Sequence, residues 1–425
     1  MKFYRFFIEM HDTLIINVPI NPAFVNHIGG DNWSIVGDLH MYGIRAEGEV
    51  RFDPKTQTTT THDLKHPFEK LPSSYSNMAI KFYDRTKNCV PYVSLNASPK
   101  FIQGHNLFGT DDISELAFEM IGTLKEIYPG FYLFLDVKNA YISRVDFTYA
   151  CRLDSNIAMS DVIDMIGRVS VGQRKPDPSR NKFATTRYWG KANNRFGYCK
   201  MYSKQNEIEA ETKSLRAKVR AGNTSAKSLL DNVFTQDLIT YSNSMLRFES
   251  TNKKQQLEKQ QMPSNLWQFI LYQRIKSVGL TLWHKWFDPI LDNVYGEVMT
   301  NYDDVEILEM CLERLTTITK SGKISQTKAN HAYRFYCFIK DKGYQHAKEV
   351  TDDRTFRRNI KSLCDIGIPK VHLQNLDGKQ NKSVALCELI RFNFEKQTPD
   401  NYTPPKSRFA SDFDEFLKPQ LQFVA

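Results

Sequence analysis

The chain has 425 residues, 41% of them hydrophobic, which is enough to bury a large core and favours two or more domains. Its 57 Lys and Arg against 48 Asp and Glu give a net charge of +9, which points toward a polyanionic partner, and its 12% aromatic residues suit stacking on unpaired bases. Seven dispersed cysteines without a Cys-x-x-Cys pair argue against a disulfide scaffold or zinc ribbon, and no uncharged apolar run is long enough for a membrane span, so we expect a soluble protein of a reducing compartment.

The first part of the chain is predicted to contain strands and one packing helix. The apolar run Thr13–Val18 indicates a strand, although no function is legible there, and further strands are expected at Met78–Tyr83 and Tyr92–Ala97. Apolar residues at helical spacing then predict a helix capped by Thr110 and stopped at Pro129-Gly130. This helix is expected to serve packing.

Three later segments are predicted to be strands with an apolar face and a polar face, because side chains alternate across a strand. They are Tyr141–Tyr149 with Arg144 and Asp146, Tyr198–Lys204 with Tyr198, Lys200, Tyr202 and Lys204, and Met245–Ser250 with Arg247 and Glu249.

If these strands pair in one sheet, carboxylates, cations and a tyrosine converge. Neighbouring ammonium groups favour the phenolate and neutralise phosphate oxygens, so Tyr202 becomes a usable nucleophile toward a phosphodiester. Asp146 and Glu249 could hold Mg²⁺ or Mn²⁺, which prefer oxygen ligands. The alternative is a basic edge hairpin and two Arg-carboxylate pairs on a solvated sheet face.

The chain changes character near Met299 and continues as short amphipathic helices. A basic helix predicted at Thr355–Cys364 carries Arg357 and Arg358 and is followed by a turn at Gly367. Helix, glycine turn and second helix form a weak helix-turn-helix signal. A solvated basic helix is the alternative.

Several short segments follow one another over nearly the whole chain in an order and spacing that form a specific set. They are His66-Pro67-Phe68-Glu69 with Leu71-Pro72, Ala97-Ser98-Pro99 with Gln103-Gly104-His105-Asn106 and Phe108-Gly109-Thr110, Ile142-Ser143-Arg144-Val145-Asp146, Tyr202-x-Lys204-x-x-Glu207, Arg247-Phe248-Glu249 and Gly367-Ile368-Pro369-Lys370. This set resembles the gene II replication initiator proteins of filamentous bacteriophages.

The resemblance implies nicking of the plus strand at the origin of double-stranded phage DNA, through a covalent 5′-phosphotyrosine, to start rolling-circle replication. It also implies rejoining of the displaced single strand into a circle, work with the host replication machinery in the bacterial cytoplasm, and a possible homo-oligomer on the origin. Similarity to plasmid rolling-circle initiators further implies an α+β fold, with a central antiparallel sheet flanked by helices and a mainly helical C-terminal domain.

Carried over to this sequence, the resemblance makes Tyr202 the nucleophile ahead of Tyr198, and Lys204 a phosphate stabiliser. Asp146 and Glu249 are then ligands of Mg²⁺ or Mn²⁺. Because no His-hydrophobic-His triplet exists, the ligand set departs from the paired-histidine pattern. His105 is a candidate third ligand or a structural histidine, and His66 a weaker candidate. The candidate DNA-binding residues are Arg144, Lys200, Arg247, Arg357 and Arg358.

In such phages an internal start yields a shorter product, and Met299 sits at the matching place. We therefore expect an endonuclease domain over residues 1–298 and a helical domain over 299–425. Two other functions remain open at this point: a metal-dependent hydrolytic nuclease in which Tyr202 is only structural, and a non-catalytic origin-binding regulator.

Overall fold

The computed structural model describes residues 9–37, 39–42, 44, 50–53, 58–61, 69–70, 78–84, 86–153, 159–172, 174–177, 179, 185–295, 304–319, 321–368, 370–376 and 390–418. The chain forms two compact units. The first comprises Met1–Ala150, Lys191–His284 and Asn393–Ala425, and the second Cys151–Gly190 and Lys285–Phe392. The predicted boundary between residues 298 and 299 lies outside the described residues and stays a prediction.

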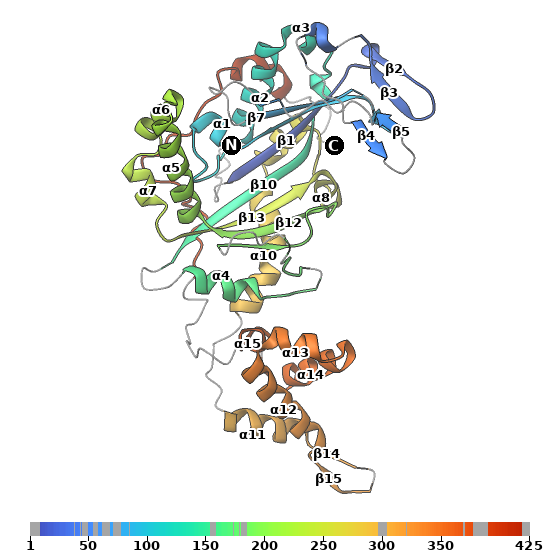
Figure 1. Ribbon diagram of the computed structural model, residues 1–425, viewed down its shortest axis with the longest axis vertical. Coiled ribbons are helices and arrows are strands. Elements are labelled where there is room, and N and C mark those ends of the chain that lie inside the picture. Colours follow the sequence, from blue (N-terminus) through green and yellow to red (C-terminus); the bar gives the residue numbers. More distant parts are fainter. Residues whose placement is uncertain are drawn as a thin grey trace. The chain divides into compact units, whose positions relative to one another are not determined.

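The first unit is built on an antiparallel sheet in which seven strands follow the order β12-β13-β10-β1-β9-β7-β6 (Figure 1). This confirms the predicted α+β fold with a central antiparallel sheet. The seven strands are β1 His11–Pro19, β6 Glu69–Lys70, β7 Met78–Tyr83, β9 Tyr92–Ala97, β10 Tyr141–Arg152, β12 Gly197–Ser203 and β13 Met245–Lys253. Two smaller sheets join β2 Val25–His27, β3 Asn32–Ile35 and β8 Thr86–Lys87, and β4 Val50–Asp53 with β5 Thr58–Thr61.

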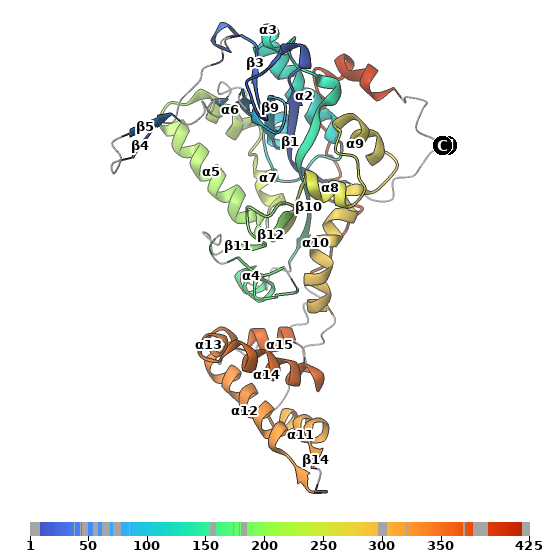
Figure 2. The same cartoon turned by 90° about the vertical axis from the view of Figure 1, so that its right-hand side faces the viewer.

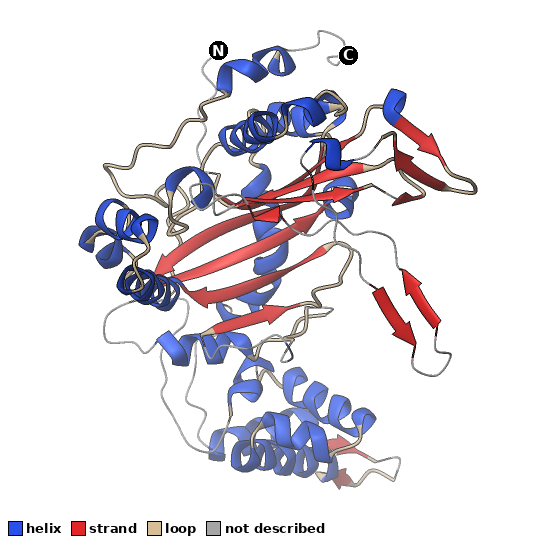
Figure 3. Cartoon of the chain, turned by 45° about the horizontal axis from the view of Figure 1, so that its top comes forward, coloured by secondary structure: helices blue, strands red, loops and turns tan. Residues whose placement is uncertain are grey.

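Helices cover both sides of this sheet: α5–α7 lie on one side, and α2, α8 and α9 on the other (Figures 2 and 3). The apolar residues of α2 and of β1, β7 and β9 form one continuous buried core. The helices of this unit are α1 Lys100–Gln103, α2 Ile113–Ile127, α3 Pro129–Tyr132, α5 Lys204–Arg220, α6 Thr224–Asn232, α7 Gln236–Tyr241, α8 Lys254–Lys259 and α9 Leu266–Gln273.

Two local predictions were wrong, both at helix starts. Asp112, rather than Thr110, caps α2: its side chain accepts a hydrogen bond of 2.8 Å from the Ser114 amide. The backbone of Thr110 instead forms a β-bridge with His11. Strand β12 ends one residue earlier than expected, because the Ser203 hydroxyl accepts from the Asn206 amide and starts α5 at Lys204.

The C-terminal segment 393–418 packs along the first unit. The Gln397 side chain bonds both backbone groups of Ala150. Glu119 of α2 accepts from Ser407 and Arg408, and aromatic rings near the end of the segment, including Phe413, enter the core. The segment is mostly without regular structure, apart from a 3-10 helix at Ala410–Leu417.

In the second unit, a helical bundle follows residue 303, which confirms the predicted helical C-terminal region. Its own core includes Ile307, Tyr336, Ile360 and Leu363. The elements of this unit are α4 Met159–Gly167, β11 Thr186–Trp189, α11 Asp304–Leu315, β14 Thr317–Ile318, β15 Ile324–Ser325, α12 Thr327–Lys342, α13 Tyr344–Val350, α14 Asp353–Asp365 and α15 Lys370–Asn375, together with the end of α10 Val278–Tyr295. None of the helices that the structure describes is both long and apolar enough to cross a membrane.

Candidate active site

Three carboxylates from three neighbouring strands meet in the interior of the first unit. Asp12 lies on β1, Asp146 on β10 and Glu249 on β13, and the sheet places β10 between the other two. One oxygen of each carboxylate lies within 4.8 Å of the others, and all three residues are buried. Such a group of oxygen ligands suits a hard divalent cation.

Each carboxylate is paired with a cation. Arg247 Nη1 lies 3.0 Å from Asp12 Oδ1, and Lys200 Nζ lies 2.8 Å from Glu249 Oε1. Arg144 bonds both oxygens of Asp146, the two-pronged geometry that makes an Arg-carboxylate pair strong. Each carboxyl group at the centre therefore has a cationic side chain at hydrogen-bonding distance.

The carboxylates differ in how readily they ionise. Burial and the negative charge of Asp12 raise the pKa of the Glu249 carboxyl, and Lys200 only partly opposes them. Burial alone would also raise the pKa of Asp12, but Arg247, Lys200 and Lys204 together hold it below its ordinary value. A proton therefore binds to Glu249 more readily than to Asp12.

Tyr202 points into this centre from β12. The strand register pairs Lys200 with Glu249 and Tyr202 with Arg247, so the predicted polar faces do meet. The Tyr202 hydroxyl donates to Glu249 Oε2 at 3.1 Å and accepts from Arg247 Nη1 at 3.4 Å. Only 7% of the residue is exposed, and burial raises the pKa of the phenol well above its ordinary value. The phenol is thus protonated unless a nearby base takes its proton.

Lys204 is fully buried at the first position of α5. Its ammonium group lies 2.9 Å from Glu207 Oε1 and 5.7 Å from the centre of the Tyr202 ring. Burial, together with the positive charge of Arg247, lowers the pKa of Lys204 to about 8. Keeping Lys204 charged beside Tyr202 therefore costs free energy, because the buried ammonium group is removed from water.

The loop from Gly104 to Thr110 closes over the same region. A Cβ on Gly109 would lie 2.2 Å from the His11 carbonyl oxygen, so only glycine allows this close approach to β1. The loop's Leu107 carbonyl accepts a hydrogen bond from Arg247. The path of this loop thus depends on both Gly109 and Arg247.

His105 lies in this loop but outside the carboxylate group. Its Nδ1 accepts from the Leu107 amide at 3.2 Å. Burial and the charges of Lys204 and Arg247 lower the pKa of His105 to about 4, so the ring is neutral near neutral pH. Among the described residues, only Asp12, Asp146 and Glu249 form a group of metal-ligand spacing.

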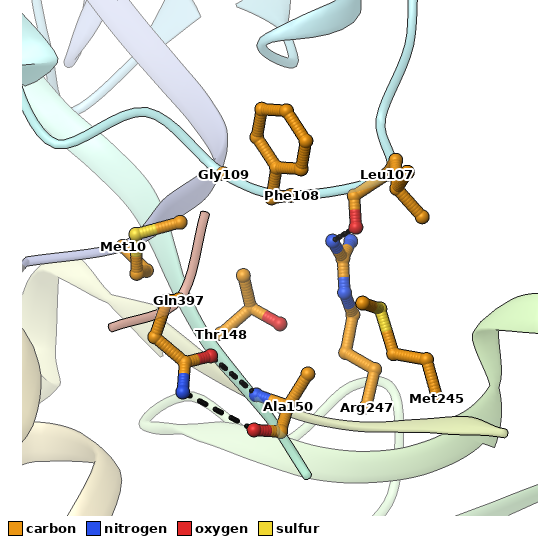
Figure 4. Close-up of a pocket in the computed structure, with 9 residues that line it drawn as sticks. All are labelled: Met10, Leu107, Phe108, Gly109, Thr148, Ala150, Met245, Arg247 and Gln397. Carbon is orange, nitrogen blue, oxygen red and sulfur yellow. Dashed lines mark hydrogen bonds between the residues drawn. The ribbon is translucent and has the colours of Figure 1, made fainter. Parts of the chain in front are cut away.

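A small pocket adjoins the centre on the side of Arg247 (Figure 4). Its lining includes Phe108, Thr148, Met245 and Gln397. Thr148 and Met245 lie two residues along their strands from Asp146 and Arg247, and therefore face the same way. The pocket therefore lies on the same face of the sheet as the carboxylates, with a largely apolar lining.

The remaining predicted residues are spread over both units. Tyr198 lies two residues before Lys200 on β12, partly buried, with the Arg144 guanidinium 5.7 Å from its ring centre. Arg357 and Arg358 are exposed on α14, where Arg357 pairs with Asp353 at 3.2 Å. His66 lies outside the described residues.

Asp12 was missed from the sequence. The strand was recognised from its apolar run, which begins at Thr13, and nothing adjacent marks Asp12 as special. Asp12 is marked as part of the site by its contact with Arg247, which lies 235 residues away along the chain. The one available signal was an acidic residue at the edge of a strand predicted to be apolar.

The fold and site define an α+β protein whose antiparallel sheet carries a buried acidic centre beside a tyrosine. Residues 10–281 match the family model for the N-terminal part of a phage replication-associated protein, and residues 318–408 match the model for the C-terminal part of the same protein. The chain belongs to this family of phage replication-associated proteins. This confirms the resemblance found in the sequence.

The replication-associated protein of Salmonella phage IKe is 32% identical over 416 residues, which cover 94% of this chain and 97% of that protein. The replication-associated proteins of Enterobacteria phages M13 and f1 are each 33% identical over 413 residues, covering 94% of this chain and all of theirs. No solved structure matches the chain.

Proposed function

We propose that this protein is a replication initiator that nicks one strand of origin DNA through Tyr202 and later rejoins the displaced strand into a circle. Membership of a phage replication family supports a role on DNA. The observation that carries the proposal is the hydrogen bond from the Tyr202 hydroxyl to Glu249, a member of the carboxylate group. The proposed nucleophile is thus hydrogen-bonded to one of the proposed metal ligands.

Asp12, Asp146 and Glu249 are proposed to bind Mg²⁺ or Mn²⁺. Three buried carboxylates at this spacing repel one another, as the raised pKa of Glu249, caused by burial and Asp12, indicates. A divalent cation relieves this repulsion, and its preference for oxygen ligands fits the donor set. When bound, the ion would polarise the scissile phosphate. Asp12 fills the third position for which the sequence suggested His105.

In the proposed reaction the Tyr202 phenol oxygen attacks phosphorus as its proton passes to Glu249 Oε2. A phosphorus–oxygen bond forms to tyrosine, and the bond to the 3′ oxygen breaks. That oxygen takes a proton from water and becomes a free 3′ hydroxyl. Glu249 Oε2 accepts the hydrogen bond from the Tyr202 hydroxyl and is therefore placed to act as this base. The ammonium groups of Lys200 and Lys204 lie 4.9 and 5.7 Å from the centre of the Tyr202 ring and are proposed to neutralise phosphate oxygens.

The covalent intermediate explains how one protein can both cut and join. A phosphotyrosine diester conserves the energy of the broken bond, so attack by a new 3′ hydroxyl restores the DNA strand and frees Tyr202 without ATP. Transfer to water would lose that energy. In this proposal the first 3′ hydroxyl primes synthesis by host enzymes in the bacterial cytoplasm.

Direct contacts to the DNA backbone are proposed for Arg144 and Lys200 around the centre and for Arg357 and Arg358 on α14, and an indirect contribution to DNA binding for Arg247. Arg144 and Lys200 keep 25% and 23% of their side chains exposed, whereas Arg247 is buried and contributes through Tyr202 and Asp12. Two copies on one origin would supply two sets of these cations.

Residues 299–425 are proposed to be a separable product of a start at Met299. Circular dichroism of a polypeptide beginning there tests this. A helical spectrum with a cooperative melt is expected, because the helices from α11 onward share one core. A disordered spectrum would contradict the boundary.

A hydrolytic nuclease is the second candidate function, since Tyr202 is buried and burial raises its pKa, as expected of a structural tyrosine. Here the metal centre would activate water instead.

The test incubates the protein with supercoiled plasmid carrying the phage intergenic region, with and without Mn²⁺. The tyrosine mechanism predicts metal-dependent nicking with protein attached to the new 5′ end. Tyr202→Phe should abolish both, while the matched Tyr198→Phe should leave the adduct. Nicking without an adduct would favour hydrolysis, and binding without nicking would favour a non-catalytic regulator.

A further inference from the structure

The hairpin between α11 and α12 exposes two isoleucines side by side. Strands β14 and β15 pair antiparallel at the end of this hairpin (Figure 1). Ile318 lies directly opposite Ile324, so both side chains lie on one face of the ribbon. They are 76% and 74% exposed. Neither belongs to the core of the helical unit.

The residues around this pair carry positive charge and hydroxyl groups. Six Lys and Arg residues and no Asp or Glu occur from Arg314 to Lys340; the nearest acidic residues along the chain are Glu313 and Asp341. Apart from the isoleucines, the segment from residue 316 to 325 consists of Thr316, Thr317, Thr319, Lys320, Ser321, Gly322, Lys323 and Ser325. Lysines and hydroxyls are the usual donors to DNA phosphates.

The tip of the hairpin is held in place before any partner binds. The Thr319 amide and hydroxyl both donate to the Lys323 carbonyl, at 2.8 and 3.0 Å. The Lys323 amide in turn donates to the Thr319 hydroxyl at 3.1 Å. Gly322 adopts a φ of +78°, a left-handed conformation that favours glycine. A turn closed in this way presents Ile318 and Ile324 without an ordering cost on binding.

Strand formation alone does not account for isoleucine at these positions. Threonine is also β-branched and favours strands, and the hairpin uses it beside Ile318, at Thr317 and Thr319. Two adjacent exposed isoleucines instead provide an apolar wedge on a basic ribbon. The positive charge of the hairpin favours a negatively charged partner. DNA is such a partner, and the faces of its stacked bases offer an apolar surface to the isoleucines.

We propose that the β14–β15 hairpin enters the minor groove of duplex DNA and inserts Ile318 and Ile324 at a base-pair step. Apolar side chains of this kind part neighbouring base pairs and bend the duplex. Lys323, directly before Ile324, contacts a phosphate beside the inserted pair. The proposal rests on the proposed function in taking DNA as the partner. It adds a duplex-reading element that is separate from the nicking centre.

Insertion is expected to favour flexible steps. Pyrimidine–purine steps such as TA unstack more easily than others, so the hairpin should prefer a TA step to a stiff A-tract. Phosphate contacts alone would not produce this preference for a TA step, so measuring it distinguishes insertion from backbone binding.

The experiment uses the full chain, without divalent metal, and short duplexes with 2-aminopurine beside a central TA step. Wild-type protein should raise the 2-aminopurine fluorescence, because the base becomes unstacked. The variant I318T/I324T keeps β-branched residues and should lose the fluorescence rise and about tenfold or more in duplex affinity. Val350→Ser, which removes a 59% exposed apolar residue at the end of α13, is the matched control and should behave as wild type.

Equal duplex affinity of I318T/I324T and the control would overturn the proposal. So would tight binding by wild type without a fluorescence rise, since the lysines would then act alone. Loss of self-association in the variant, with duplex affinity unchanged, would assign the hairpin to a protein interface. Failure of wild type to nick origin plasmid would refute the proposed function and leave the fluorescence result standing.

Discussion

Replacing Asp12 with asparagine tests whether this residue holds the acidic centre together. Asp12 and Arg247 form an ion pair of 3.0 Å in which the side chains are 4% and 1% exposed. Removing one partner of a buried pair leaves an uncompensated charge and typically costs about 3–5 kcal/mol. Asparagine keeps an oxygen toward Arg247, and Arg247 also donates to Tyr202 and to the Leu107 carbonyl. We therefore expect D12N to lose about 3 kcal/mol of folding free energy, the lower end of this range.

Urea unfolding followed by tryptophan fluorescence measures this loss, and titration with Mn²⁺ measures metal binding in the same samples. The folded-state pKa of Asp12 is lowered by its cations, which outweigh burial, so its stabilisation is present above the unfolded pKa and is lost as pH falls through the folded value. The deficit of D12N should therefore shrink below about pH 4.

Asp400→Asn provides the control, because Asp400 forms an exposed pair with Lys396 at 2.7 Å and should contribute almost nothing. If D12N matched this control in stability and bound Mn²⁺ like wild type, Asp12 would be neither a structural partner of Arg247 nor a ligand.

Three further predictions concern other parts of the first unit. The affinity for Mn²⁺ should rise with pH until Glu249 is ionised and then level off. Burial and the charge of Asp12 raise the pKa of Glu249, and Mn²⁺ must displace the Glu249 proton to bind. An affinity that titration calorimetry finds independent of pH would contradict this. Folding lowers the pKa of Lys204 from 10.5 to about 8, so the folded state binds fewer protons than the unfolded state between these pH values. The stability of the wild type should therefore rise from pH 8 to 10.5 relative to that of Lys204→Met. Parallel curves of stability against pH for the two proteins would rule out this shift. A Cβ on Gly122 would lie 2.1 Å from the Phe409 ring, so Gly122→Ala should speed hydrogen exchange in residues 393–418 even though alanine favours helix; unchanged exchange would mean that the contact is not needed.

Local patterns predicted the sheet face well. Alternation placed Lys200 with Tyr202, and Arg247 with Glu249, on polar faces, and the register brings those faces together. Strand β7 was predicted to its last residue because its apolar alternation is regular. Helix starts were less certain, since Thr110 and Asp112 are both good caps and only the bridge from Thr110 to His11 decides between them.

Contacts between distant segments could not be read from the sequence. Asp12 joins the site only because β1 lies beside β10, and no spacing rule relates it to Asp146. The packing of the C-terminal segment could not be predicted because its partners, Glu119 and the apolar residues of α2, lie nearly 300 residues earlier in the chain. The family resemblance supplied roles for Tyr202 and Lys204, whereas the hydrogen bond from Tyr202 to Glu249 came from the structure.

Mapping the covalent DNA adduct tests the central claim most directly. Trypsin cuts after Arg195, Lys200 and Lys204, so Tyr198 and Tyr202 fall in separate peptides, residues 196–200 and 201–204. After reaction with origin plasmid and Mn²⁺ followed by nuclease digestion, mass spectrometry should find a nucleotide on the 201–204 peptide, at Tyr202. A nucleotide on the 196–200 peptide, or nicked plasmid with no modified tyrosine, would contradict the account.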